Sequence, residues 1–284
     1  MTRLILILRI IFIVFTIICI LFCVEAHLRY KRKVGIDEDK DYTSKYQYFV
    51  QAIYDENDQL FGYELLIREY NPETKKWQLP KGVNDFPLNL VAEAVEKQRH
   101  QFKDSVRYIA INMTVGQLID YRAVNFLDWV EGVLPNKIII LELDNKDVLS
   151  STRYRRHQLM RDLKELAHSY PNIRVTIEDV DSSKESYKKL TRFLPWIDYI
   201  KFNADTFNKS KDHWIDVTLA QWQRELKKYH IQVILGKIET ESQGALAKQL
   251  NINLREGYLY QGPQPIKVSG KKLIPKTRKK NDDF

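Results

Sequence analysis

The sequence predicts an α/β protein in which a closed (β/α)8 barrel follows one membrane-spanning helix. Three observations support this fold class. The first 24 residues are almost wholly apolar, short strands rich in Val, Ile and Tyr alternate with amphipathic helices from Tyr46 onwards, and eight strand candidates are enough to close a barrel. The chain has 284 residues, and a barrel of this kind needs roughly 250. One barrel would therefore use nearly all of the chain.

The candidate membrane segment covers residues 4–24 and is apolar except for Arg9 and Thr16. As a helix it would reach about 30 Å, which is enough to cross the hydrocarbon core of a bilayer. Four basic residues follow it directly: Arg29, Lys31, Arg32 and Lys33. Because basic residues tend to stay on the cytoplasmic side, we expect residues 1–26 to be a transmembrane signal anchor with the rest of the chain in the cytoplasm.

A cleaved signal peptide is the alternative reading of the same segment. Val24-Glu25-Ala26 resembles a small-x-small cleavage site, and Arg3 with Arg9 could form a basic n-region. The basic cluster just after this site opposes translocation, so the sequence favours the anchor.

The net charge of +8 lies at the two ends of the chain. Residues 1–35 and residues 267–284 each sum to +5, whereas the part between them sums to −2. This distribution argues against a nucleic-acid-binding body and suits an anionic membrane surface, although the C-terminal tail could equally be a solvated tail. We expect a polar basic linker over 27–45, a barrel domain over 46–266 and a basic tail over 267–284.

The alternating elements indicate a parallel sheet. The strand candidates are residues 46–54, 62–68, 106–112, 137–143, 173–178, 197–202, 231–235 and 255–260. The helical stretches between them are residues 87–100, 116–131, 153–169, 184–193, 213–229 and 241–250. A doubly wound open sheet is the alternative, but the chain has no G-x-G-x-x-G or Walker-type loop of the kind that such a sheet uses for nucleotides.

Polar side chains gather where the predicted strands end, which is the face of a barrel that carries its chemistry. They are Glu64, Arg68, Asn112, Glu142, Glu178, Asp179, Lys201, Asn203, Glu239 and Glu256. Hard oxygen ligands of this type could bind Mg²⁺ or Mn²⁺ and hold a phosphodiester. Carboxylates at strand ends also cap the following helices, so the pattern alone leaves both readings open.

Seven segments in order resemble the motifs of EAL domains and together span about residues 46–266. Residues 62–68 (GYELLIR) resemble the signature G-x-E-A-L-L-R, and residues 233–240 (VILGKIET) resemble V-I-A-E-G-V-E-T. The remaining matches are residues 111–118, 141–143, 177–179, 198–203 and 256–263. The resemblance implies an EAL-type, TIM-like barrel.

Active members of this family hydrolyse cyclic di-GMP to linear pGpG with two divalent metals. The resemblance implies five metal-site residues: Glu64, Asn112, Glu142, Glu178 and Asp179. It makes Lys201 the lysine beside the nucleophilic water and Glu239 a supporting residue. Gln51 and Arg68 match residues that contact the dinucleotide, together with Glu64, Asn112 and Asp179, and Tyr258 could stack on a guanine or pack in the core.

The departures from the family pattern are concentrated at the metal site. Gly236 replaces the first Glu of E-G-V-E-T and offers no side-chain oxygen, Asn203 replaces an Asp, and Glu178 is one methylene longer than the bridging Asp. The D-D-F-G-T-G loop has lost its glycines over residues 178–183, and Glu256 replaces a Gln. We therefore expect weak or absent Mg²⁺ or Mn²⁺ binding, and Lys201 alone would not suffice for catalysis.

Three functions remain open from the sequence. The first is a single-pass membrane receptor that binds cyclic di-GMP and acts on a membrane partner such as exopolysaccharide machinery. The second is a protein-interaction module, with a homodimer as one arrangement, that no longer binds the nucleotide. The third is a working cyclic-di-GMP phosphodiesterase. The sequence favours the first, a degenerate EAL domain with little or no hydrolytic activity.

Overall fold

The computed structural model describes residues 2–31, 46–80, 86–102, 105–207 and 214–266. Its first element is one long helix, α1 (Thr2–Lys31). Within Arg3–His27 the most apolar segment of 18 residues has a mean hydropathy of 3.2, and none of its residues is buried in the structure. This helix is long and apolar enough to cross a membrane by length and composition.

Helix α1 continues five residues beyond the start of the expected linker, because the helical backbone runs through Lys31. The remainder of that linker, residues 32–45, and the expected basic tail over 267–284 lie outside the described residues.

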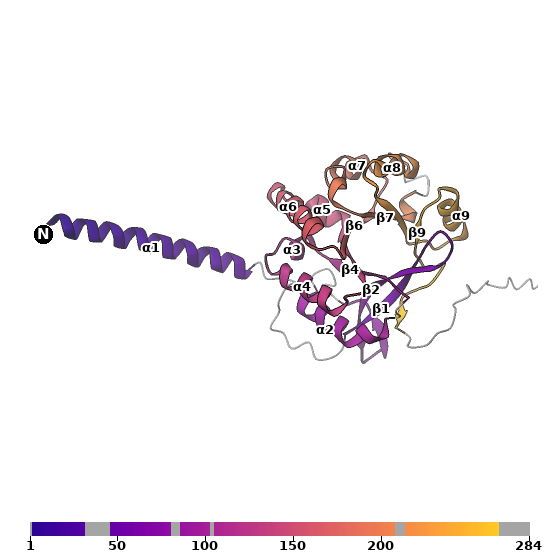
Figure 1. Cartoon of the computed structure of the whole chain (residues 1–284), viewed down its shortest axis with the longest axis horizontal. Helices are drawn as coiled ribbons and strands as arrows, with labels where there is room; N and C mark the ends of the chain where they lie inside the picture. Colours follow the sequence, from indigo (N-terminus) through magenta and orange to yellow (C-terminus); the bar gives the residue numbers. More distant parts are fainter. Residues whose placement is uncertain (1, 32–45, 81–85, 103–104, 208–213, 267–284) are drawn as a thin grey trace, which may run out of the picture.

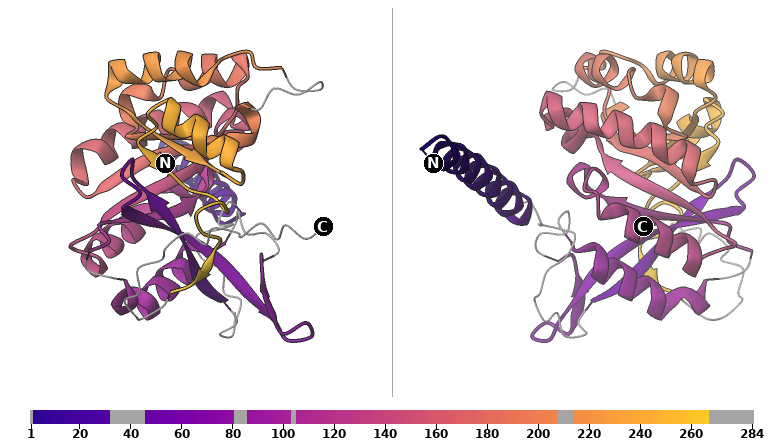
Figure 2. Two further views of the ribbon diagram at one scale, coloured as in Figure 1. Left: turned by 90° about the vertical axis from the view of Figure 1, so that its right-hand side faces the viewer. Right: turned by 60° about the vertical axis from the view of Figure 1, so that its left-hand side comes forward.

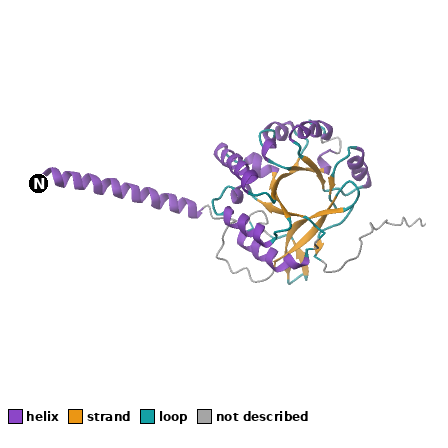
Figure 3. Ribbon diagram, in the orientation of Figure 1, coloured by secondary structure: helices purple, strands orange, loops and turns teal. Residues whose placement is uncertain are grey.

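The predicted closed barrel is confirmed, as the ring of strands in Figure 3 shows. Its eight strands are β1 (Tyr46–Tyr54), β2 (Leu60–Asn71), β4 (Tyr108–Met113), β5 (Ile138–Asp144), β6 (Ile173–Val180), β7 (Tyr199–Asn203), β8 (Gln232–Gly236) and β9 (Leu254–Arg255). Neighbouring strands from β2 to β9 are parallel, and β1 closes the ring by pairing with both β2 and β9.

The expectation of a wholly parallel sheet is wrong for β1, which runs antiparallel to both of its neighbours in the ring. The cause is a tight turn between β1 and β2. The Asp55 carboxylate accepts hydrogen bonds from the backbone N–H groups of Asn57 and Gln59 at 2.9 and 2.8 Å, and Asp58 has a φ of 57°. A turn of this kind joins adjacent antiparallel strands directly, so no crossover helix separates β1 from β2.

Helices cover the outside of the ring (Figures 1 and 2). They are α2 (Leu88–Gln98), α3 (Val115–Leu118), α4 (Ala123–Val133), α5 (Asn145–Ser150), α6 (Arg153–Ser169), α7 (Lys184–Leu190), α8 (Leu219–Leu226) and α9 (Glu241–Gln249). Their apolar faces pack on the outward side chains of the strands; Val130, Leu159 and Trp222 are fully buried there. The main core therefore lies between the helices and the barrel wall.

Two predicted elements differ from the structure. Residues 255–260 were expected to form one strand, but β9 ends at Arg255 and a turn follows, because Gly257 has a φ of +148°. The expected helix over 116–131 is two helices, α3 and α4. Two short strands, β3 (Lys76–Gln78) and β10 (Gln264–Pro265), also pair at the edges with β2 and β1.

Candidate functional site

A second, smaller hydrophobic cluster defines the inside of the barrel. It consists of Ile53, Ala110, Ile140, Tyr199, Ile234 and Leu254. Side chains alternate between the two faces of a strand, so the residue two positions further along each strand faces the same interior. For β4, β5, β7, β8 and β9 these residues are Asn112, Glu142, Lys201, Gly236 and Glu256. The strand pattern alone thus places a layer of mainly polar residues, called the acidic layer below, next to the apolar cluster inside the barrel.

The Lys201 ammonium is the centre of that layer. Its Nζ lies 2.9 Å from Glu142, 3.1 Å from Glu64, 3.1 Å from Glu256 and 3.2 Å from Glu178. Burial alone would lower the pKa of Lys201, but these four carboxylates outweigh it and raise the pKa well above its usual value. Lys201 is therefore a buried cation shared by four acids.

One ammonium cannot neutralise four carboxylates, and the pKa values of the four acids are shifted in different directions and to different extents. Burial raises the pKa of Glu142 well above its usual value and that of Glu256 to about 8, and it also raises the pKa of Glu178. Burial would raise the pKa of Glu64 too, but Lys201 and a hydrogen bond from Asn112 bring it below its usual value. Without a further cation, part of the cluster keeps its protons at neutral pH.

The acidic layer fits one divalent cation. Glu64, Glu142 and Glu178 each offer an oxygen, and these three oxygens lie within 4.8 Å of one another. The Asn112 side chain adjoins them, donating to Glu64 Oε1 at 3.2 Å. Within the described residues, Oε2 of Glu142 and Oε2 of Glu256 are buried and accept no hydrogen bond. Hard oxygens held in this way suit Mg²⁺ or Mn²⁺.

Asp179 stands apart from this layer. It follows Glu178 on β6 with a φ of 52°, and its carboxylate lies 2.6 Å from the Lys237 ammonium. The side chain of Asp179 is one-third exposed and that of Lys237 is half exposed. A lysine is thus paired with a carboxylate that the family resemblance makes a metal-site residue.

Three further positions contribute no carboxylate to the acidic layer. Gly236 ends β8 inside the barrel and contributes no side chain. Asn203 ends β7, and its side-chain oxygen accepts a hydrogen bond from the Asp205 backbone at 3.1 Å. Glu239 is exposed in the loop after β8 and is not among the four glutamates that contact Lys201.

A cavity of about 900 Å³ opens over the acidic layer, and Glu64, Asn112, Glu142 and Glu178 form part of its wall. Three cationic side chains line the same cavity: Arg68, Lys146 and Arg155. A space of this size accommodates a nucleotide-sized ligand, and guanidinium groups suit its phosphates.

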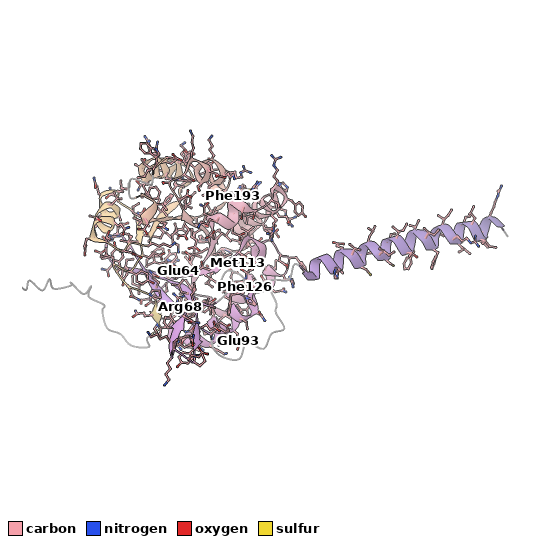
Figure 4. The ribbon with its side chains drawn as sticks, turned by 180° about the vertical axis from the view of Figure 1, so that it is seen from behind. Glu64, Arg68, Glu93, Met113, Phe126 and Phe193 are labelled. Carbon is pink, nitrogen blue, oxygen red and sulfur yellow. The ribbon has the colours of Figure 1, made fainter. Side chains whose placement is uncertain are left out.

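Arg68 lies four residues beyond Glu64 on β2, and Figure 4 labels both. Its guanidinium donates to the Ile67 carbonyl at 2.8 Å. Burial lowers the pKa of Arg68, while the neighbouring Tyr258 and Glu64 raise it. Tyr258 is 65% exposed, so the core-packing alternative for this ring is wrong. Gln51 is on β1, directly opposite Glu64 in the antiparallel register.

Sequence reasoning missed four residues of the site. Glu256 was recognised at a strand end but not assigned to the cluster, although its position two residues beyond the interior Leu254 places it there. Lys237 carries no sequence signal for its pairing with Asp179, since 58 positions separate the two residues. Lys146 on α5 and Arg155 on α6 line the same cavity as Glu64 and Arg68 on β2, and no sequence pattern relates them to these residues.

Comparison with known proteins agrees with this architecture. A family model described as EAL domain matches residues 43–263. A probable cyclic di-GMP phosphodiesterase of Escherichia coli, PdeD, is 24% identical over 230 residues, which cover 74% of this chain and 40% of PdeD. The chain thus spans less than half the length of this curated relative.

Solved structures with the same fold were also found. The EAL enzyme Bd1971, in a cAMP-bound form, superposes with a TM-score of 0.62 at 16% identity, over 78% of this chain and 64% of that one. The Bacillus subtilis protein YkuI, solved with cyclic di-GMP and calcium, gives a TM-score of 0.60 at 17% identity, over 78% of this chain and 55% of YkuI. At these identities the likeness concerns the fold.

Proposed function

This chain belongs to the EAL-domain family, and on that premise we propose that it is a membrane-anchored, degenerate member that binds cyclic di-GMP and hydrolyses it slowly or not at all. The barrel would serve as a receptor whose occupied state is recognised by another membrane component. Each part of this proposal has its own support.

The proposal of weak hydrolysis rests on the residues that would be expected to hold a second metal. Gly236 has no oxygen to offer, and the Asp179 carboxylate is paired with Lys237 at 2.6 Å. The residues present therefore fit one divalent cation, held by Glu64, Glu142 and Glu178 with Asn112 beside them. A bound cation would polarise a phosphate oxygen and lower the pKa of a water molecule. Loss of groups that stabilise the transition state costs on the order of 10³-fold in rate.

Ligand binding is supported by the cavity and its cations. Arg68 can give a bidentate contact to a phosphate, and Lys146 and Arg155 add positive charge to the same wall. The exposed ring of Tyr258 lies near enough to Arg68 to affect its pKa, so a base stacked on that ring would keep its phosphate close to the guanidinium.

The membrane role is supported by α1 and by charge. The 25-residue stretch Arg3–His27 is apolar enough to cross a bilayer, and the basic residues after it favour a cytoplasmic barrel. We propose the domain order anchor, linker, barrel and basic tail, with a membrane protein such as exopolysaccharide machinery as the partner. The barrel could act on that partner as a monomer or as a homodimer.

An active phosphodiesterase is the second candidate, and one observation favours it. Lys201 and the carboxylates that could hold a first metal lie together in one cluster, as they would in an active site. PdeD, the curated relative, is described as a probable cyclic di-GMP phosphodiesterase. If Glu178 can bridge two cations, hydrolysis would continue in spite of Gly236.

One sample can separate the two candidates. Full-length protein in detergent is titrated with cyclic di-GMP by calorimetry, with and without Mg²⁺, and the same sample is then analysed for pGpG. We expect binding without appreciable product. Product at a rate typical of intact relatives would establish the phosphodiesterase instead, and no binding under either condition would contradict the receptor.

Variants test whether binding occurs in the cavity. Arg68→Ala is expected to weaken cyclic di-GMP binding by at least about tenfold, because a charge-assisted bidentate contact is lost. Arg224→Ala on α8, outside the residues that line the cavity, is the matched control and should bind as the unchanged protein does.

A further inference from the structure

The acidic layer contains a carboxylate at a position where the family pattern has none, and it lacks one where the pattern has a glutamate. We propose that Glu256, at the end of β9, supplies the cation-binding oxygen that Gly236, at the end of β8, lacks. The carboxylate has thus been exchanged between two adjacent strands. The inference rests on the proposed function in that it takes the acidic layer to hold a divalent cation.

The first observation is that the two positions share one space. A Cβ atom built on Gly236 would lie 3.1 Å from Oε1 of Glu256 and 3.4 Å from Cγ of Lys201. The first distance is tighter than most real Cβ contacts, so any side chain at 236 would press on the Glu256 carboxylate and move it by a few tenths of an ångström. The two positions therefore adjoin at one point of the acidic layer.

The backbone holds Glu256 at that point. The N–H of Glu256 donates to the Leu235 carbonyl at 3.0 Å, and its own carbonyl accepts from the Ile238 N–H at 3.1 Å. Two backbone hydrogen bonds therefore hold Glu256 to residues on either side of Gly236. The next residue, Gly257, lies so close to Ile238 that a Cβ there would be 2.2 Å from the Ile238 carbonyl oxygen. The position of the Glu256 carboxylate is therefore set by the backbone of residues 256 and 257 against Ile238.

The second observation concerns the unused oxygen. Glu256 is 4% exposed, its Oε1 contacts Lys201 at 3.1 Å, and its Oε2 accepts no hydrogen bond from the part of the chain that the structure describes. Leaving a buried polar atom unpaired costs about 1–3 kcal/mol. A hard cation such as Mg²⁺ or Mn²⁺ would satisfy this oxygen, and Oε2 of Glu142 is unpaired in the same way.

A role only as a partner of Lys201 does not account for Glu256. Lys201 already has Glu64, Glu142 and Glu178 at 2.9–3.2 Å. A fourth carboxyl group at this distance is therefore not needed to balance the charge of Lys201. A divalent cation would give its buried oxygen a partner.

The test is a titration of full-length protein in detergent with Mn²⁺ alone, followed by calorimetry and by electron paramagnetic resonance of free Mn²⁺. Glu256→Gln keeps the size and removes the charge, and we expect it to weaken Mn²⁺ affinity at least about tenfold. The double variant Gly236→Glu with Glu256→Gln restores the family pair, and its affinity should return to within about threefold of the unchanged protein. Glu73→Gln, in the exposed turn after β2, is the control and should change nothing.

Two outcomes would overturn the proposal. Unchanged Mn²⁺ affinity in Glu256→Gln would leave Glu256 as a partner of Lys201 alone. No Mn²⁺ binding by the unchanged protein would remove the cation itself, and a cyclic di-GMP titration of that metal-free sample would then show whether the receptor function survives separately. If Glu256→Gln does not fold, Glu256→Asp takes its place in the titration. We expect the same loss of Mn²⁺ affinity, because the shorter side chain moves the carboxylate oxygen away from the cation.

Discussion

Lys237 and Asp179 form an ion pair at the mouth of the barrel, with Nζ 2.6 Å from Oδ1 and 2.8 Å from Oδ2. Both residues have left-handed backbone conformations, with φ of 56° and 52°. Lys237 stands where the family motif has a glycine, a residue that adopts this conformation without strain. The chain thus keeps a strained lysine at the place where its ammonium meets the acid.

Replacing Lys237 separates the strain from the charge. Lys237→Gly and Lys237→Ala both remove the ammonium, but only the alanine keeps a Cβ in the left-handed region, which costs about 1–2 kcal/mol. We expect the glycine variant to be more stable than the alanine variant by about 1 kcal/mol. Denaturant unfolding of the two full-length variants in detergent measures the difference. Equal stabilities would show that the left-handed conformation at 237 carries no strain.

Lys201 is expected to be the most sensitive position in the barrel interior. Lys201→Met removes an ammonium group that Glu64, Glu142, Glu178 and Glu256 all contact. Breaking a buried ion pair from one side typically costs 3–5 kcal/mol, and we expect a loss of about that size when chelator is present. Lys228→Met removes a lysine that pairs with Glu225 at the surface and should have no measurable effect. A Lys201 variant as stable as this control would contradict the charge balance described above.

The acidic layer also predicts how stability depends on pH. The pKa of Glu256 is about 8 in the folded chain, against an ordinary value of 4.5. Between these values the folded state keeps a proton that the unfolded state has released, so the stabilising contribution is complete below pH 4.5 and is lost as the pH rises through 8.

Glu256→Gln has no such proton to lose. In metal-free protein its midpoint of thermal unfolding should therefore exceed that of the unchanged protein at pH 8.5, and the two should converge near pH 5. Thermal unfolding across this pH range, with chelator in every sample, checks the prediction. A difference that is the same at both ends of the range would mean that Glu256 does not titrate within it.

Much of the barrel could be predicted because strand periodicity is a local property. Apolar residues facing the helices recur with period two, and this pattern located β1, β2 and β4 to β8. The β-then-α alternation does not predict the direction of β1, because the turn at residues 55–58 joins β1 to β2 directly as an antiparallel pair. The predicted last strand is too long because apolar and aromatic residues continue through 258–260, whereas Gly257 turns the chain after β9.

The site was predictable in its members but not in its pairings. Family motifs and strand ends indicated Glu64, Glu142 and Lys201, which the structure brings together. The contact of Glu256 with Lys201 joins the end of β9 to β7 across β8, so it depends on the order of strands in the sheet. The Asp179 pair depends in the same way on two loops that are 58 positions apart. Such contacts follow from the three-dimensional arrangement of the strands, which no local sequence pattern contains.

The turn after β9 provides the last test, because it connects backbone geometry to the acidic layer. Gly257 has a φ of +148°, and a Cβ there would lie 2.2 Å from the Ile238 carbonyl oxygen. Gly257→Ala must displace the Ile238 segment and with it Glu256, so we expect a loss of more than about 2 kcal/mol together with weaker Mn²⁺ binding. Gly132→Ala in α4 meets nothing within 4 Å and should raise stability by up to about 1 kcal/mol. Denaturant unfolding and Mn²⁺ titration of both variants are the measurements, and a Gly257 variant that keeps full Mn²⁺ affinity would show that the turn does not position Glu256.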